Sequence, residues 1–435
     1  MKFRENFGDY VEVHRGKEIY QGTLLPSPEQ GYFLLKLSNG YNIGFNKKEV
    51  INIKILERKK SEHSPQYPKL QNKETKDNFK VPYDPKKKNI AMVVLGGTIA
   101  AKLNPGKGGV DFIENSQDLF KYYPELFEKV NVTIVEIPFM KGSENMDFKD
   151  WQKIAKIVCN LVNNKNISGV IVTQGTDTLH YTSSALSFFL QNLGKPVIIT
   201  FSQRSIDRAS SDANLNLLCS SKIAISNFSG VAVVGHENSN DESCIAIPGT
   251  KTRKLHSSKR DAFKSINAKP FFRIFKNKIE RISECPLRNE RKKCSVDSKF
   301  EEKIAILKFY PGQDPKILDY YLEKNYKGII IEMLGLGQIA TSEARLSWIK
   351  KIKEVQEKGL IICAAAQTIY GRLNPLVYIT GRELINTGII YLEDMLSETA
   401  YVKLGYVLAK TQNKKEVKKF MLTNMVGELN NRIEN

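Results

Sequence analysis

Two glycine-containing loops carry the side chains whose types and spacing could do chemistry. The segment VTQGTDT at 172–178 gathers hydroxyl, amide and carboxylate groups around Gly175, directly after an apolar run. The segment VLGGTIA at 94–100 places Thr98 after a pair of glycines. A glycine lets the backbone turn sharply and approach a ligand closely. A threonine hydroxyl becomes a nucleophile when a base removes its proton, so both loops are candidates for covalent catalysis.

Both loops follow runs that are typical of buried strands. Residues 89–95 and 169–173 form two such runs, and residues 181–192 are typical of a helix. In an open parallel sheet, ligands bind at the carboxyl edge of the strands, and the first turn of a helix there would direct free N–H groups at an anion. Thr and Asp before a helix are also ordinary N-cap residues, so the second loop has a purely structural interpretation as well.

The alternation of strands and helices continues along the chain. Further apolar runs that we expect to be strands occupy residues 131–137, 196–200 and 230–234. An amphipathic stretch at 150–163 lies between them and predicts a helix. Continuous apolar strands separated by helices indicate a parallel sheet covered on both faces. We therefore expect an α/β domain over residues 89–285.

A second α/β domain is expected over residues 300–435. It begins with an apolar run near Ile304 and continues with a strand at 328–333. A helix is predicted at 341–358, with Trp348, Ile349 and Ile352 on one face, and its C-cap is Gly359. A strand is predicted at 360–365.

The N-terminal part of the chain predicts a small all-β module. Short β-rich runs occur at residues 9–13, 19–25, 32–37 and 41–45. The pair Asn39-Gly40 favours a tight hairpin between the last two runs. So short a module can close into a barrel of the SH3-like kind, which hides its strand edges. We expect this module over residues 1–57 and a basic, proline-containing linker over 58–88.

Composition narrows the class of protein. With 435 residues, of which 41% are hydrophobic, the chain is typical of a globular protein of two or three domains. No apolar run has membrane-spanning length, and the start MKFRENFGDYVEV lacks the apolar core of a signal peptide. The six cysteines form no CxxC and the five histidines no HxxxH. We expect reduced thiols, no zinc site, no membrane association and a cytoplasmic location.

The charge of the chain is strongly positive. The formal net charge is +19, and residues 251–300 hold 16 Lys or Arg against 5 Asp or Glu. Surface ion pairs of a thermophile would also raise Lys, but they usually raise Glu in step. A concentrated positive field is typical of a chain that binds a polyanion, nucleic acid first.

Together, VLGGTIA and VTQGTDT resemble the two signature motifs of the bacterial-type asparaginase family. Thr98 and Thr176 match that family's pair of catalytic threonines. The family also has a lysine eleven positions before the serine of a closing FKS, and Lys254 stands at that distance from Ser265. Without the resemblance, a lysine among so many cations would be taken as a solvated side chain.

The resemblance implies a site that hydrolyses an amide. Thr98 would be the nucleophile. Thr176 would supply an assisting hydroxyl, Asp177 would orient, and Lys254 would take the proton. Which threonine attacks first is left open by the sequence. Relatives carry a loop tyrosine that activates the first threonine, and at its position this chain has Pro105.

Substrate-binding residues are implied in the same way. Ser143 and Glu144 in the KGSENMDF segment match a Ser-acid pair that would hold the α-carboxylate and α-ammonium of the ligand, with Asp177 sharing the ammonium. The backbones of Gly97 and Gly175 would line the same site, because glycine permits close approach to a ligand. Ser143 also has a structural interpretation, as a turn residue.

Over nearly its full length, the chain resembles a narrower family, the D subunits of archaeal glutamyl-tRNA(Gln) amidotransferases. LKLSNGYNIGF at 35–45 and FSQRSIDRASSDA at 201–213 carry this likeness beside the two threonine loops. The resemblance implies a chain that binds no cofactor, hydrolyses glutamine and passes ammonia to a partner, the E subunit. That partner would activate Glu-tRNA(Gln) with ATP and Mg²⁺, in a heterotetramer built on a homodimer of this chain. A free asparaginase or glutaminase and a catalytically silent RNA-binding scaffold are the alternatives.

Overall fold

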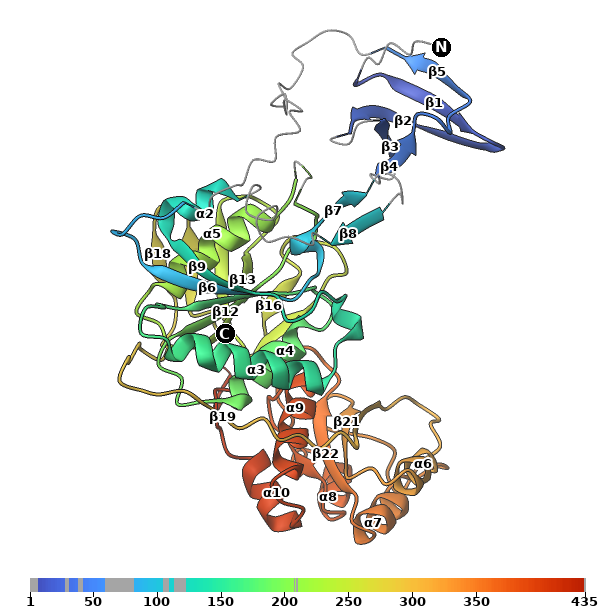
Figure 1. Cartoon of the computed structure of the whole chain (residues 1–435). Helices are drawn as coiled ribbons and strands as arrows, with labels where there is room; N and C mark the ends of the chain where they lie inside the picture. Colours follow the sequence, from blue (N-terminus) through green and yellow to red (C-terminus); the bar gives the residue numbers. More distant parts are fainter. Residues whose placement is uncertain are drawn as a thin grey trace. The chain divides into compact units, whose positions relative to one another are not determined.

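The computed structural model describes residues 7–27, 31–37, 42–58, 82–104, 109–112, 123–206, 208 and 210–433 (Figure 1). The chain divides into two compact units. One comprises residues 1–81, 100–122 and 205–209, and the other residues 82–99, 123–204 and 210–435. Most of the linker expected at 58–88 lies outside the described residues.

The first unit is built on a five-stranded antiparallel sheet, which confirms the expected all-β module. In the order β4-β3-β2-β1-β5, the sheet contains β1 (Tyr10–Arg15), β2 (Glu18–Pro26), β3 (Tyr32–Leu37), β4 (Asn42–Asn46) and β5 (Asn52–Glu57). Alternate residues of β1 point inward, so Val11 and Val13 are buried. They share a core with Phe33 and Phe45, whose rings stack with centroids 5.4 Å apart.

Two features of this unit depart from the sequence interpretation. The strand β5 was not expected, because most of its residues are exposed and NIKILE lacks a clear apolar face. A further hairpin is formed by β7 (Ala101–Asn104) and β8 (Gly109–Phe112). The Asn39-Gly40 hairpin signal and Pro105 lie outside the described residues, although β3 and β4 are paired antiparallel as expected.

The second unit contains an eight-stranded sheet of order β18-β17-β14-β13-β12-β10-β6-β9. The five expected strands are parallel: β6 (Asn89–Val94), β9 (Asn131–Glu136), β10 (Val170–Thr173), β12 (Pro196–Thr200) and β13 (Gly230–His236). Beyond these expected parallel strands, the sheet continues on one side with three antiparallel strands that the sequence analysis did not name: β14 (Ser243–Pro248), β17 (Phe272–Phe275) and β18 (Ile279–Arg281). The connection at 237–242 is too short for a crossover helix, so β14 must return antiparallel to β13.

Helices cover both faces of this sheet (Figure 1). They are α2 (Pro124–Lys129), α3 (Phe148–Asn163), α4 (Leu179–Phe189) and α5 (Ala213–Ala224). Asp147 begins α3 with a capping box, in which it accepts the N–H of Asp150 and Asp150 accepts the N–H of Asp147. The helix α4 ends earlier than the expected 181–192, because the chain leaves it to form β11 (Leu190–Gln191) against β19 (Ser295–Val296).

The second α/β domain belongs to the same unit and has a four-stranded parallel sheet. Its strands, in sheet order, are β20 (Ile304–Lys308), β21 (Gly328–Met333), β22 (Ile361–Ala366) and β23 (Ile390–Tyr391). Its helices are α6 (Ile317–Glu323), α7 (Ile349–Glu357), α8 (Ile379–Ile385), α9 (Ser397–Leu408) and α10 (Lys414–Met421). None of the helices in the described parts of the chain is long and apolar enough to cross a bilayer.

The helix expected at 341–358 is shorter than predicted. It begins at Ile349, because the backbone N–H of the buried Trp348 donates to Ala340 O at 3.0 Å, which closes a wide loop instead of a helical turn. Its end agrees with the prediction. Gly359 has a φ of +97°, and the N–H of Leu360 donates to Val355 O at 3.0 Å, as in a Schellman motif.

A buried ion pair joins the two α/β domains. Lys251 Nζ lies 2.7 Å from Asp394 Oδ2, and the two side chains are 1% and 0% exposed. Asp394 also accepts hydrogen bonds from the backbone N–H and the side-chain amide of Asn430. Burial lowers the pKa of Lys251, while the Asp394 carboxylate opposes this shift. The charge of Lys251 therefore depends on Asp394.

We expect Asp394→Ala to lower the free energy of unfolding by about 3–5 kcal/mol, because it leaves the Lys251 ammonium buried and unpaired. Urea unfolding of the full chain measures this loss. The double variant Lys251→Met, Asp394→Leu should lose less, since it leaves no unpaired charge. Equal losses in the single and double variants would show that packing, rather than the ion pair, is responsible.

Candidate active site

The two threonine loops meet at the carboxyl edge of the large sheet, as the sequence predicts. β6 and β10 are parallel neighbours with Val94 opposite Thr173, so the loops that follow them start at the same level. Gly97 has a φ of +78°, and a Cβ added to it would lie 2.3 Å from the Cα of Gly175. The loops therefore touch backbone to backbone, and a larger residue at Gly97 does not fit.

The loop that contains Ser143 closes a third side of the site. Ser143 is 1% exposed and begins a short 3-10 helix, η2 (Ser143–Asn145). Its Oγ accepts the backbone N–H of Asp177 at 3.1 Å, and its carbonyl accepts the hydroxyl of Thr178 at 2.7 Å. Because the Oγ accepts this bond, the hydroxyl proton can point to a ligand. Glu144 is exposed, and its carboxylate accepts a bond from the Asn145 amide.

Lys254 reaches the site from a separate hairpin. It is the last residue of β15 (Thr252–Lys254), which pairs with β16 (Phe263–Ser265), so Lys254 lies opposite Phe263. Its Nζ donates to Thr176 Oγ1 at 2.7 Å and to Asp177 Oδ1 at 2.8 Å. The lysine side chain is 11% exposed, whereas that of Asp177 is 64% exposed. The structure thus brings together three residues that the sequence analysis named.

Thr98 stands at the start of the 3-10 helix η1 (Thr98–Ala100), directly after Gly97. It is partly buried. Among the described residues, its hydroxyl has no hydrogen-bond partner, whereas the hydroxyl of Thr176 is bound to Lys254. A side chain without a partner is free to turn toward a substrate. The residue in place of the usual loop tyrosine, Pro105, is outside the described residues.

The sequence analysis missed His180, which lies directly behind these groups. It lies on the first turn of α4, directly after the loop that carries Thr176. Burial, together with the nearby charges of Arg253 and Lys254, lowers the pKa of His180 from its ordinary value of 6.5 to about 3. The imidazole is therefore neutral at physiological pH. No local sequence pattern pointed to His180.

Glu398 of α9 supports the same region from the second α/β domain. Its Oε1 lies 3.1 Å from Arg253 Nε and 3.8 Å from His180 Nε2. Arg253 precedes Lys254 in β15, so this ion pair fixes the strand that presents the lysine. A residue far away in the sequence thus helps to shape the site.

In the basic run at 251–300, some cations form ion pairs within the second unit and others are exposed without such a pair among the described residues. Several of its cations are held by carboxylates within the second unit: Lys251, Arg253, Lys254, Arg260, Lys264 and Arg273. Exposed cations for which no ion pair is found in the described parts of the chain include Lys276, Arg291, Lys292 and Lys293. The positive field available to a partner is therefore smaller than the sequence count suggests.

The fold and this set of side chains define a class. The family models "Asparaginase, N-terminal" and "Glutaminase/Asparaginase C-terminal domain" match residues 89–286 and 303–421. Among solved structures, the L-asparaginase of Thermococcus kodakarensis superposes with a TM-score of 0.71 at 25% identity, over 79% of this chain and 99% of that chain. L-asparaginase I of Vibrio cholerae gives a TM-score of 0.68 at 28% identity, again over 79% and 99%. The second unit is an asparaginase-type α/β structure.

The N-terminal module narrows the family. Residues 6–56 match the model "GatD N-terminal domain". The D subunit of the glutamyl-tRNA(Gln) amidotransferase of Pyrococcus abyssi is 42% identical over 98% of this chain and 95% of its own length. That of Methanococcus maripaludis is 38% identical over 98% and 99%. The chain belongs to the family of glutamyl-tRNA(Gln) amidotransferase D subunits.

A pH experiment tests the buried neutral state of His180. The folded-state pKa of His180 lies below the ordinary value of 6.5. Between pH 6.5 and about pH 3, His180 is therefore protonated more often in the unfolded chain than in the folded chain. The contribution of the neutral His180 side chain to the stability of the folded chain is complete above pH 6.5 and is lost as the pH falls toward 3. We expect His180→Gln to unfold with a weaker pH dependence than wild type between pH 7 and about 4, as measured by urea midpoints. Parallel curves for the two proteins would refute the assignment.

Proposed function

We propose that this chain is the glutaminase component of the tRNA-dependent amidotransferase that converts Glu-tRNA(Gln) to Gln-tRNA(Gln). The full-length likeness to D subunits supports the assignment. One observation in the structure carries the chemistry: Lys254 is bonded to both Thr176 and Asp177, beside the loop that presents Thr98. Amide hydrolysis needs a nucleophile, a base and an orienting carboxylate, and these residues supply all three.

In the mechanism that we assign, the hydroxyl of Thr98 attacks the side-chain amide carbon of glutamine. Lys254 takes a proton by way of the Thr176 hydroxyl, and Asp177 keeps the amine in place. The C–N bond then breaks as the leaving nitrogen receives a proton, which releases ammonia and leaves an acyl ester on Thr98. Water hydrolyses the ester and gives glutamate. Thr98 attacks first in this scheme because its hydroxyl has no hydrogen-bond partner among the described residues, whereas that of Thr176 is engaged by Lys254.

The substrate's backbone groups would be held by the loops around the nucleophile. The buried hydroxyl of Ser143 has a proton available for the α-carboxylate. The exposed carboxylates of Glu144 and Asp177 would share the α-ammonium. Gly97 and Gly175 would let the backbone approach the ligand, since neither has a side chain to occupy the space.

The proposed function includes partners that this chain does not contain. The E subunit of the amidotransferase would activate Glu-tRNA(Gln) with ATP and Mg²⁺ and receive the ammonia, whereas this chain would bind glutamine and no cofactor. A homodimer of this chain would form the centre of a two-plus-two heterotetramer in the cytoplasm. The names of the relatives support membership in an amidotransferase complex.

Ammonia release from glutamine and from asparagine tests the proposal. We expect glutamine to be the better substrate, with slow turnover by the isolated chain and faster turnover with Glu-tRNA(Gln) and the E subunit, because the two sites are coupled. The three conditions are the chain alone, the reconstituted complex, and the complex with Glu-tRNA(Gln). Equal rates in all three, or a preference for asparagine, would favour a free amidohydrolase.

Variants of the proposed site complete this test. Thr98→Ala and Lys254→Ala should each lower turnover by on the order of 10³-fold or more in the complete complex. The matched control is Thr98→Ser, which keeps a hydroxyl nucleophile and should retain far more activity. If both alanine variants keep more than a tenth of wild-type ammonia release, the site is misplaced.

The exposed cations are expected to face the tRNA. The triple variant Arg291→Gln, Lys292→Gln, Lys293→Gln should weaken Glu-tRNA(Gln) binding to the complex and reduce the salt dependence of log K by about one unit for each phosphate that is no longer neutralised. Filter binding across a salt series measures both effects. The control triple Lys415→Gln, Lys418→Gln, Lys419→Gln removes the same charge from α10. Equal effects of the two triples would indicate net charge rather than a specific surface.

A further inference from the structure

The hairpin that presents Lys254 depends on support from outside itself. Among the described strands, β15 and β16 pair with each other alone, and a two-stranded hairpin needs packing against other elements to be stable. Ala262 and Phe263 supply part of this packing, because both are buried in the core of the second unit. Residues 255–259, directly after Lys254, are exposed. Nevertheless, the Lys254 Nζ must stay within hydrogen-bonding distance of Thr176 and Asp177 for the proposed chemistry. Interactions at the tip of the hairpin therefore matter for the position of the lysine.

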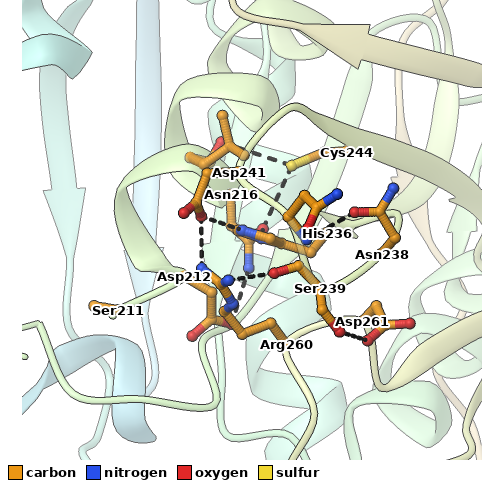
Figure 2. Close-up of polar contacts among 12 residues, drawn as sticks. Ser211, Asp212, Asn216, His236, Asn238, Ser239, Asp241, Cys244, Arg260 and Asp261 are labelled. Atoms are coloured by element: carbon orange, nitrogen blue, oxygen red, sulfur yellow. Dashed lines mark hydrogen bonds and ion pairs between the residues drawn. The ribbon is translucent and has the colours of Figure 1, made fainter. Parts of the chain in front are cut away.

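Arg260 connects this tip to the loop between β13 and β14. Its Nη1 donates to Asp241 Oδ1 at 2.6 Å, and its Nη2 donates to the carbonyl of Ser239. The guanidinium is charged at any physiological pH and its side chain is 17% exposed. On the same tip, Asp261 accepts a hydrogen bond from the hydroxyl of Ser239 at 3.4 Å (Figure 2). The tip is thus bound to the loop from two adjacent residues.

His236 continues the connection into the sheet. It is the last residue of β13, and its side chain is fully buried. Its Nε2 lies 3.1 Å from Asp241 Oδ1, and its Nδ1 lies 2.6 Å from Asn216 Oδ1 (Figure 2). The side-chain amide of Asn216 cannot be reversed, because its Nδ2 donates to Phe201 O at 2.9 Å. The oxygen of Asn216 must therefore face the imidazole.

This arrangement specifies the protonation state of His236. The Asn216 oxygen and the Asp241 carboxylate are both acceptors, so both ring nitrogens must carry a proton for both bonds to form. Only the imidazolium has two N–H groups. The other titratable groups nearby are Cys244, which donates its thiol to Asn216 Oδ1 at 3.4 Å, and Asp212, which accepts the second Asn216 proton.

The charges around Asp241 agree with a cation on the ring. Burial alone would raise the pKa of Asp241, but the hydrogen bonds from His236 and Arg260 lower it below its ordinary value. Asp212 anchors the other end of the connection. Its carboxylate accepts the backbone N–H groups of Gln203 and Arg204 at 3.0 and 3.1 Å, directly after β12. Since β12 neighbours β10, the connection ends at the sheet edge that carries Thr176.

We propose that His236 and Arg260 are positioning residues for Lys254. The imidazolium and the guanidinium share the carboxylate of Asp241, and this shared anion ties the tip of the lysine hairpin to the edge of the sheet. The inference rests on the proposed function, because it assigns a role to the position of Lys254.

Kinetics of glutamine hydrolysis by the reconstituted complex test the role of Arg260. Arg260→Gln should lower kcat by on the order of tenfold to a hundredfold, because a small displacement of a catalytic group is costly. The KM for glutamine should change little, since Arg260 lies outside the loops that bind the substrate. Arg260→Lys should restore part of kcat, because it keeps one charged donor for Asp241. The matched control, Lys259→Gln, removes the neighbouring exposed charge and should behave as wild type.

The outcome for Lys254→Ala separates the two proposals. If Lys254→Ala is inactive while Arg260→Gln and Asp241→Asn keep the wild-type kcat, the positioning role is wrong and the proposed function stands. If Lys254→Ala retains activity, the proposed function fails. A loss of kcat that Arg260→Lys does not relieve at all would also contradict the charge-based link.

The protonation state can be read directly by NMR of the full chain with ¹⁵N-labelled histidine. The two acceptors that face the ring require both nitrogens of His236 to carry protons, and the signal is assigned by its disappearance in His236→Gln. Asp241→Asn should shift this ring toward the neutral form, because the amide replaces the carboxylate. A neutral His236 in the wild-type chain would overturn the proposed imidazolium link. If Arg260 only stabilised the hairpin, its replacement would leave the protonation signal of the His236 ring unchanged.

Discussion

The close approach of the Gly97 and Gly175 backbones is the constraint on which the site depends. Parallel pairing of β6 and β10 brings the two loops to one edge, but side chains at these positions would hold the loops apart. With glycine at both positions the two backbones approach closely, and Thr98 and Thr176 are the residues that directly follow these two glycines. A Cβ on Gly175 would in turn lie 2.9 Å from Ser143 Oγ, so the same absence of side chains admits the third loop.

The second α/β domain acts on the chemistry without lying in the site. Glu398 holds Arg253, the residue before Lys254, and Asp394 holds the buried Lys251 at the base of the same hairpin. The hairpin is therefore supported by carboxylates of the second domain at its base and by Asp241 at its tip. Because Glu398 and Asp394 are charged and buried, removing one of them leaves an unpaired charge next to the lysine hairpin.

Positive charge serves two purposes in this chain. Within the run at 251–300, many cations organise the second unit through ion pairs, and their charge is neutralised locally. The cations that remain exposed, which include Lys276, Arg291, Lys292 and Lys293, are available to a polyanion. A charge count along the sequence adds both kinds together, so it overstates the field that a nucleic acid would meet.

The sequence by itself determined the class of fold, the N-terminal β module and the loops at Thr98 and Thr176, because these depend on local periodicity and on glycine spacing. Lys254 could be named only by resemblance, since its distance from Thr176 along the chain carries no geometric information. Tertiary structure alone decided the antiparallel side of the large sheet, the late start of α7 and the cluster around His180 and Glu398. These features arise from interactions between residues that are not neighbours in the chain, such as Trp348 with Ala340 and Glu398 with Arg253, and no local pattern encodes such interactions.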